Sequence, residues 1–368
     1  MIPYIRGQVT HQAHVDIPDQ LCEEEYARNG FFGKYAHLYR KNAPVGWSSI
    51  EGPLKPRSFD LNPIPSNVDY LQSRTPILEN EDVRLHLSRF ETKMPYFFRN
   101  ADGDEVQFIH EGEGKLETDF GPLNYEKGDY IVIPRGTVYR FHPKSPTQLL
   151  TIESFSEVGF PDKGMLGQHA LFDPAAIRVP TPEPNAVHEQ ADQYELRIQR
   201  RGEITKVYYP FYPIDTVGWK GTLTVMQINV RDIRPVSSDR YHLPPSAHTT
   251  FVARNFVICS FLPRPLENGD PGAVKVPFFH SNIDFDEVIF YHDGEFFSRT
   301  NIKPGMLTFH PQGIHHGPQE GAIKRSAQAT RTNEIAVMVD TKNPLNICEQ
   351  AKTLENKDYW MSWKAAKK

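Results

Sequence analysis

The chain has 368 residues, of which 39% are hydrophobic and 12% aromatic, and this is enough to build two domains with sizeable cores. Its formal net charge is −5 without any basic block, which argues against a nucleic-acid partner. No run approaches the roughly 18 consecutive apolar residues of a membrane span, which argues against a membrane protein.

The cysteines and the turn residues narrow the class further. Cys22, Cys259 and Cys348 lie far apart and match no zinc-binding spacing, and the first residues lack the apolar core of a signal peptide. A reducing, cytoplasmic location is therefore expected. The 31 prolines and 24 glycines, together with the scarcity of long amphipathic helical patterns, predict an all-β protein with short strands.

Along the chain, residues 1–80 are expected to be an irregular segment packed on the β-domains, and residues 81–160 the first of these domains. Residues 161–205, rich in proline and charge, are interpreted as a linker that holds little regular structure. Residues 206–368 are expected to form the second β-domain, ending in a short helix. Within the first domain, strands are predicted in seven segments: 83–90, 94–100, 105–112, 114–121, 128–136, 137–143 and 148–155.

The most informative stretch spans residues 279–317. Between Gly-marked turns it carries His280, Glu287 and His316, and two imidazoles with one carboxylate are the ligands that hold Fe(II) and leave positions open for substrate and O2. A hairpin turn is expected at residues 293–294, another turn at 303–305, and a strand at 306–310.

The order of these residues resembles the two motifs of the cupin superfamily. The first motif is His280-x-Asn282-(x4)-Glu287-(x6)-Gly294, and the second is Gly305-(x5)-Pro311-x-Gly313-(x2)-His316. A second histidine is usual where Asn282 stands, which indicates three protein ligands. The resemblance implies jelly-roll β-barrels. Because residues 105–139 echo both motifs, the chain is interpreted as a bicupin.

The echo in the first domain lacks the histidines of a metal site. Glu105 occupies the glutamate position, Tyr139 stands in the place of the last histidine, and Asn100 and Asp102 stand where the first histidines belong. We therefore expect this copy to be degenerate. The nearby His110 is expected to lie in a solvated turn.

Other residues are candidates for proton transfer and substrate contact. His242 lies in a proline-held turn, which suits a general base, and His248 competes for this role. His310 ends a strand and is expected to contact substrate or bound oxygen, while His315 could exchange roles with its neighbour His316. Three phenylalanines are expected either to form an apolar wall for a flat aromatic substrate or to pack in the core: Phe278, Phe279 and Phe296.

Several segments together resemble the homogentisate 1,2-dioxygenase family, loosely in the first half and closely from about residue 205. They are the segment 213–221 (PIDTVGWKG), the run 242–246 (HLPPS), the run 276–287 with its two ligands, His316-Gly317-Pro318, and the tail 358–363 (DYWMSW). The length is closer to that of the shorter bacterial members.

This resemblance implies a two-domain all-β protein with an inert first half. It also implies Fe(II) held by His280, Glu287 and His316, with His242 as the acid/base. Members of the family open homogentisate with both atoms of O2 to give maleylacetoacetate, a step of tyrosine and phenylalanine catabolism. They assemble as trimers, often paired into hexamers.

The substrate part of the motif departs from the family. Where the family has Arg-Gly-x-Tyr after the glutamate, this chain has residues 293–296 (DGEF), and Phe296 cannot contact a carboxylate as tyrosine would. A related gentisate-like or hydroquinone substrate is therefore an open alternative. Two others are a bicupin that binds a small molecule without turnover, and an isomerase that uses a different divalent metal.

Overall fold

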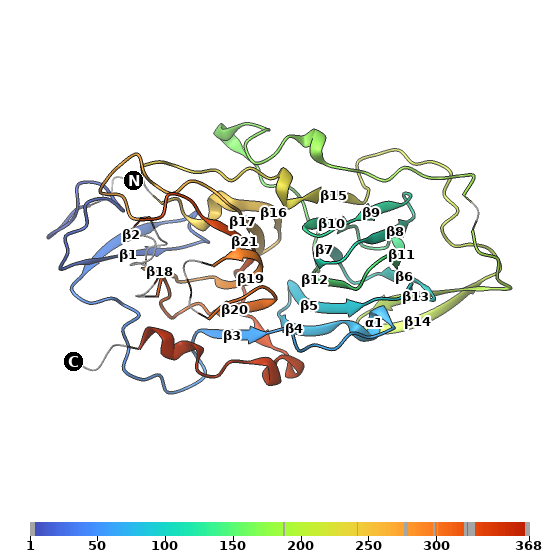
Figure 1. The fold of residues 1–368 in the computed structure, drawn as a ribbon, viewed down its shortest axis with the longest axis horizontal. Coiled ribbons are helices and arrows are strands. Elements are labelled where there is room, and N and C mark those ends of the chain that lie inside the picture. The colour runs from blue at the N-terminus through green and yellow to red at the C-terminus, as the bar shows by residue number, and fades with distance from the viewer. Residues whose placement is uncertain are drawn as a thin grey trace.

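The structure is a computed structural model that describes residues 4–186, 188–240, 242–275, 279–296, 299, 301–319, 322 and 328–364. Strands dominate it, and they form two β-domains that lie side by side along the long axis of the molecule (Figure 1). The all-β class expected from the sequence is thus confirmed. Within the described ranges, no helix is both long and apolar enough to cross a membrane.

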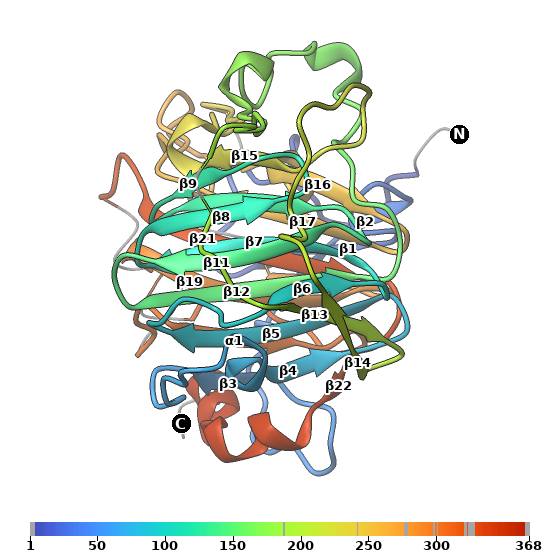
Figure 2. The same ribbon diagram turned by 90° about the vertical axis from the view of Figure 1, so that its right-hand side faces the viewer.

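The first domain consists of two sheets, and Figure 2 looks onto the outer one. The inner sheet has seven strands, in the spatial order β15 (Met226–Asn229), β10 (Asp129–Ile133), β7 (Asp104–Glu111), β12 (Thr147–Ser154), β5 (Val83–Phe90), β4 (Thr75–Glu79) and β22 (Asn346–Ile347). The outer sheet has six, in the order β14 (Glu203–Tyr209), β13 (Tyr194–Arg200), β6 (Phe97–Asn100), β11 (Val138–Pro143), β8 (Gly114–Thr118) and β9 (Leu123–Tyr125).

The second domain also combines two sheets. Its six-stranded sheet has the order β16 (Thr249–Ala253), β17 (Phe256–Phe261), β21 (Asn333–Thr341), β19 (Asp286–Glu295), β20 (Met306–His310) and β3 (Arg57–Asp60). Its three-stranded sheet has the order β18 (Phe279–Asn282), β1 (Cys22–Ala27) and β2 (Tyr35–Arg40).

Helices are few and short in the part of the chain that the structure describes. The α-helix is α1 (Tyr70–Ser73), which begins after Asp69, whose carboxylate accepts hydrogen bonds from two backbone N–H groups of its first turn. The 3-10 helices are η1 (Gly164–Leu166), η2 (Pro174–Ala176), η3 (Val230–Asp232), η4 (Pro245–His248), η5 (Glu349–Leu354) and η6 (Tyr359–Trp363). The expected C-terminal helix is therefore present as two 3-10 segments, η5 and η6.

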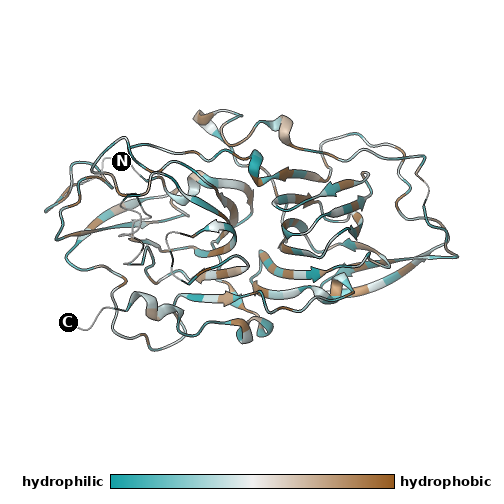
Figure 3. Ribbon diagram, in the orientation of Figure 1, coloured by the Kyte–Doolittle hydropathy of each residue, from teal (hydrophilic) through white to brown (hydrophobic). Residues whose placement is uncertain are grey.

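The alternation of side chains along the strands creates cores on both faces of the inner sheets. On β10, Tyr130 and Val132 face the second domain, whereas Ile131 and Ile133 fill the core of the first. The largest apolar cluster thus lies between the two domains and includes Phe108, Val288 and Phe290. Hydrophobic residues correspondingly concentrate on the strands of both domains (Figure 3). This shared core joins the domains into one body.

The seven strand segments expected in the first domain each contain a strand, and the strand expected at residues 306–310 is β20. Residues 1–80, expected to be irregular, instead supply β1, β2, β3 and β4. Of these, β1, β3 and β4 pair with strands from later in the chain, and β2 pairs with β1. The segment interpreted as a linker supplies β13, which pairs in parallel with β6 of the first domain. The pairings of β1 with β18, of β3 with β20 and of β13 with β6 join segments distant in sequence, so they depend on tertiary contacts.

The hairpin turn expected at residues 293–294 is wrong, because β19 continues to Glu295 and pairs with β21 over its whole length. The Asp293–Gly294 pair follows a bulge in this pairing, and Gly294 has a φ of +88°. A Cβ at residue 294 would lie 1.7 Å from the carbonyl oxygen of Asn333. Glycine is therefore required here by close contact within the sheet.

The expectation that His110 lies in a solvated turn is also wrong. His110 is on β7 and is buried, and its Nδ1 lies 2.9 Å from Nδ1 of His292 on β19. The two rings meet at the junction between the domains, where Phe108 and Phe290 pack against them. The bulge in β19 lies beside His292.

Candidate metal centre

The three residues predicted to bind metal converge in the second domain. The Nε2 of His280 lies 3.7 Å from Oε2 of Glu287, and the Nε2 of His316 lies 3.4 Å from the same oxygen. The two imidazole ring centres are 4.1 Å apart. All three side chains are buried. One carboxylate oxygen thus faces two imidazole nitrogens in a single small volume.

Local structure brings these groups together from three segments. His280 lies on β18 and Glu287 near the start of β19, while His316 follows the turn after β20. The backbones of His280 and His316 exchange two hydrogen bonds, of 2.9 and 3.1 Å. This isolated antiparallel bridge holds the two imidazoles beside each other without a longer strand.

The geometry fits a metal ion. Metal–ligand bonds of roughly 2.1 Å place neighbouring ligand atoms about 3 to 3.5 Å apart, close to the spacings around Glu287. Both ring nitrogens of His316 are buried and make no hydrogen bond within the described residues. A buried imidazole of this kind needs a partner, and a divalent cation beside Glu287 would supply one.

The protonation states also suit metal binding. Burial alone would raise the pKa of Glu287, but the neighbouring histidines, His316 first, lower it well below its usual range. Burial lowers the pKa of His316 to about 3, and the charge of His280 adds to this effect. An ionised carboxylate and a neutral imidazole are the forms that coordinate metals.

His310 lies behind the carboxylate of Glu287, not in the cavity where substrate contact was expected. Its Nδ1 is 2.6 Å from Oε1 of Glu287, and its Nε2 is 3.2 Å from the hydroxyl of Tyr359 on η6. The ring also stacks on His316, with centres 4.7 Å apart. Since both ring nitrogens are engaged, His310 positions the other oxygen of Glu287.

His242 lines a cavity that also reaches His280 and Glu287; we refer to it as the central cavity. The Nδ1 of His242 lies 3.1 Å from Oε1 of Glu267. A carboxylate at this nitrogen favours the tautomer whose Nε2 can accept a proton. Burial, acting against Glu267, lowers the pKa of His242, so the neutral ring prevails at neutral pH.

His248 and His315, the two alternatives, occupy different positions. His248 lines the same cavity but packs edge-on against Phe261, and burial holds its pKa well below the usual range. His315 points its Nε2 at Glu24 of β1, at 2.7 Å, and Glu24 also pairs with Arg40. His316, and not His315, therefore faces Glu287.

Of the three phenylalanines expected at the substrate, Phe278 lies outside the described residues, and the other two pack in apolar clusters. Phe279 packs in a cluster with Val45 and Trp363, and Phe296 packs edge-on against Tyr291, with ring centres 4.7 Å apart. Tyr291 lines the central cavity, but neither phenylalanine does so among the described residues. Residues 276–278 of the ligand-bearing run lie outside the described part of the chain.

The sequence reasoning missed the charged lining of this cavity. Arg264, Arg299 and Glu334 all face it, and all three are buried. Nη1 of Arg264 makes no hydrogen bond within the described ranges. Burial raises the pKa of Glu334, against the effect of the two arginines. A lone arginine in the apolar run 256–266 was the available signal for Arg264.

Comparison with known proteins identifies relatives of this chain. Models of the N-terminal and C-terminal parts of homogentisate 1,2-dioxygenase match residues 46–229 and 242–368, respectively. A protein of Saccharolobus solfataricus, provisionally named a dioxygenase, is 31% identical over 363 residues, covering 93% of this chain and 92% of that protein. The homogentisate 1,2-dioxygenase of Bradyrhizobium diazoefficiens is 27% identical over 74% of this chain, and the match spans 63% of its own length.

Solved structures overlap more weakly. A cupin 2 conserved barrel domain protein from Leptotrichia buccalis superimposes with a TM-score of 0.35 and 10% identity, covering 78% of this chain and 96% of that protein. This overlap carries no information about activity.

Proposed function

This chain belongs to the homogentisate 1,2-dioxygenase family, and on that premise we propose that it is an Fe(II)-dependent dioxygenase. Its proposed reaction is the opening of a hydroquinone-type aromatic acid with both atoms of O2. Homogentisate is the first substrate to test. The observation that carries the proposal is that His280, Glu287 and His316 converge, and that the first two of them line the same cavity as His242.

The ligand residues suit this chemistry. Ferrous iron, when bound, would supply a centre at which O2 and the aromatic ring meet and exchange electrons. His280, Glu287 and His316 would hold it on one side. His310 fixes the second oxygen of Glu287 and is itself held by Tyr359, so the carboxylate cannot rotate freely.

His242 would transfer the proton. Glu267 orients the ring through Nδ1, which leaves Nε2 as the base that removes a proton from a ring hydroxyl of the substrate. The lowered pKa of His242 keeps this base neutral before the reaction. The buried cavity walls exclude water from the ring during turnover.

Arg264 and Arg299 favour a substrate that carries a carboxylate. A guanidinium pairs strongly with a carboxylate, and burial strengthens the pair. This observation favours homogentisate or gentisate over plain hydroquinone. Because Phe296 stands where the family has tyrosine, the arginines would replace the hydroxyl that holds the acid group.

Replacing Arg264 tests this assignment. Arg264→Met should raise KM for the acid substrate about 10- to 100-fold through loss of a charge-assisted hydrogen bond, and leave the iron content unchanged. Turnover of plain hydroquinone, which has no carboxylate, should change little. Equal losses for both substrates would contradict a role of Arg264 in binding the acid group.

A substrate panel tests the function itself. The protein would be purified without oxygen and its iron measured, and then O2 consumption would be followed with homogentisate, gentisate and hydroquinone in turn. We expect stoichiometric O2 uptake with one of the two acids. An iron-loaded protein that consumes no O2 with any of them would favour a binding role. Light scattering would test the trimer or hexamer that the family relationship suggests.

A further inference from the structure

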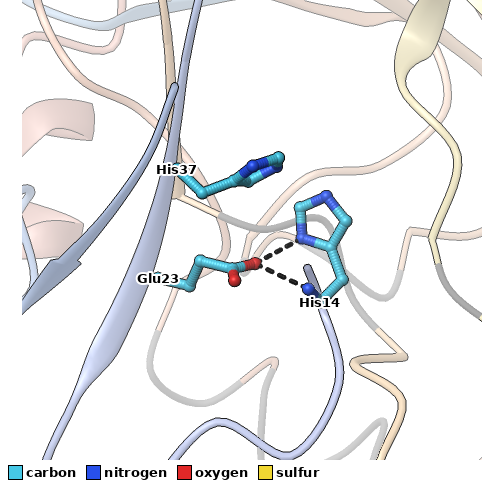
Figure 4. Close-up of side chains that lie close together, drawn as sticks. All are labelled: His14, Glu23 and His37. Atoms are coloured by element: carbon cyan, nitrogen blue, oxygen red, sulfur yellow. Dashed lines mark hydrogen bonds and ion pairs between the residues drawn. The ribbon is translucent and has the colours of Figure 1, made fainter. Parts of the chain in front are cut away.

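A second cluster of histidines and carboxylates lies on the N-terminal strands, separate from the residues assigned above. It consists of His14, Glu23, Glu25 and His37, and Figure 4 shows three of them facing one another. His14, Glu23 and Glu25 are 4%, 3% and 8% exposed. Several carboxylates and imidazoles are seldom buried together without a counter-charge or a bound ion.

Strand geometry accounts for the convergence. Glu23 and Glu25 are two residues apart on β1 and share one face, while His37 on β2 lies directly opposite Glu25 in the antiparallel pair. His14 arrives from the preceding segment, with a φ of 64° that is uncommon outside glycine. Its backbone N–H donates to Oε1 of Glu23 at 2.9 Å, which anchors this segment on β1.

The distances repeat those of the first cluster. The Nε2 of His14 lies 3.3 Å from Oε2 of Glu25, and the Nε2 of His37 lies 3.8 Å from the same oxygen. The corresponding values around Glu287 are 3.4 and 3.7 Å. In both clusters, two imidazole Nε2 atoms therefore face one glutamate oxygen.

Glu23 completes a metal-site arrangement. Its Oε1 lies 2.6 Å from Nδ1 of His14 (Figure 4). A carboxylate on the far nitrogen of a metal-bound histidine fixes the ring and makes it a better ligand. Glu23 is therefore placed to orient the imidazole of His14 without binding the ion itself.

We propose that His14, Glu25 and His37 bind a second divalent transition-metal ion, with Glu23 positioning His14. Imidazole nitrogens and a carboxylate oxygen suit ions such as Zn²⁺ or Fe²⁺, and the second carboxylate offsets the ion's charge. This site goes beyond the proposed ring-opening activity and does not depend on it.

The place of the site in the fold points to a structural role. β1 pairs in parallel with β18, and Glu25 is the register partner of His280. The ion would join β1, β2 and the segment before them into one unit. This unit supports the strand that carries the first ligand of the other centre.

A proton on His14 is the competing source of positive charge. Burial lowers the pKa of His14, but Glu23 and Glu25 outweigh it and raise the value to about 9. Without metal the cluster is therefore an ion pair. Metal uptake would displace this proton, so the number of bound metal ions distinguishes the two states.

Counting ions in the full-length protein tests the proposal. Metal would be stripped with a chelator, Zn²⁺ added as the probe, and bound zinc measured after gel filtration. We expect two ions per chain in the wild type, one in Glu287→Ala, one in His37→Ala and none in the double variant. His11→Ala, which alters an exposed histidine three residues before His14, is the matched control and should retain two.

Two conservative variants sharpen the assignment. Glu25→Gln should lose the second ion, whereas Glu23→Gln should bind it about 10- to 100-fold more weakly. Zn²⁺ should also raise the melting temperature of Glu287→Ala but not that of the double variant. Zero zinc on folded Glu287→Ala would overturn the proposal without needing any variant of the cluster. Wild-type stoichiometry in His37→Ala and Glu25→Gln would overturn it as well.

Discussion

The two β-domains place different chemistry at the same position. In the first, Glu105 of β7 accepts a hydrogen bond from Tyr139, at 2.6 Å, and pairs with Arg74, at 2.8 Å. In the second, Glu287 of β19 faces the imidazoles of His280 and His316. A guanidinium supplies the positive charge in one domain, and the other offers ligands for a cation.

A second pair of acids supports this contrast. Glu153 lies opposite Glu105, and Asp340 lies opposite Glu287, in the same register of the two sheets. Although burial raises the pKa of Glu153, His86 and Arg74 lower it to about 2. Burial and Glu287 instead raise the pKa of Asp340 well above its usual range. In the first domain the guanidinium of Arg74 therefore balances the two carboxylates, whereas in the second Asp340 is held neutral beside Glu287.

The largest effect should come from Glu287→Gln. This change removes a ligand charge, so we expect loss of bound iron and at least a 100-fold loss of O2 consumption. The matched change in the first domain, Glu105→Gln, should keep both. Iron per folded chain and O2 uptake are the measurements. Iron loss in Glu105→Gln would break the distinction between the domains.

Replacing His242 separates proton transfer from metal binding. His242→Gln should retain iron yet lower turnover by about 10²- to 10⁴-fold, the usual contribution of a general base. Because the pKa of His242 is lowered, wild-type activity should be maintained above pH 6.5 and fall as acid protonates the ring. This acid limb should be missing from the residual activity of the variant. An unchanged pH profile would exclude His242 as the base.

The charge built into the first domain can be removed with Arg74→Met. The buried carboxylates of Glu105 and Glu153 would lose their partner, and we expect a loss of about 3–5 kcal/mol in the free energy of unfolding. Lys93→Met removes a surface pair with Glu189 and should cost at most about 1 kcal/mol. Denaturant titration compares them, and equal costs would show that Arg74 is not the counter-charge.

The effect that is smallest at neutral pH concerns the junction between the domains. Burial, with a smaller contribution from the neighbouring charges, lowers the pKa values of His110 and His292 to about 3 each. The unfolded chain binds these protons near pH 6.5, whereas the folded chain binds them only near pH 3. The free energy of unfolding is therefore unaffected by the pair above pH 6.5 and decreases as the pH falls toward 3. We expect each ring to lower the free energy of unfolding by up to about 3 kcal/mol by pH 4.

Unfolding measured across this pH range would test the junction. The double variant His110→Gln with His292→Gln should show a shallower slope of unfolding free energy against pH. A slope equal to that of the wild type would mean that other groups control the acid limit.

The convergence of the three candidate ligands was predictable from the sequence, whereas the residues that support them were not. The spacing between turn residues was enough to single out His280, Glu287 and His316. The local sequence pattern was likewise enough to predict strand β20. Arg74, Arg264 and Tyr359 reach their partners over long sequence separations, so no local pattern reports them. Even Asp293-Gly294, a strong hairpin signal, is overridden by pairing with β21. Local rules locate the reactive groups, and the tertiary fold decides what surrounds them.

The contacts that η6 makes beside the metal centre have a consequence for biosynthesis. All three candidate metal ligands have been synthesised once residue 316 has left the ribosome. The hydroxyl of Tyr359 that holds His310, and the indole of Trp363 that donates to the carbonyl of Gly317 at 3.2 Å, come more than forty residues later. A nascent chain would therefore present a loose set of ligands before the pocket tightens. We therefore expect metal to bind more tightly once η6 has folded onto the site.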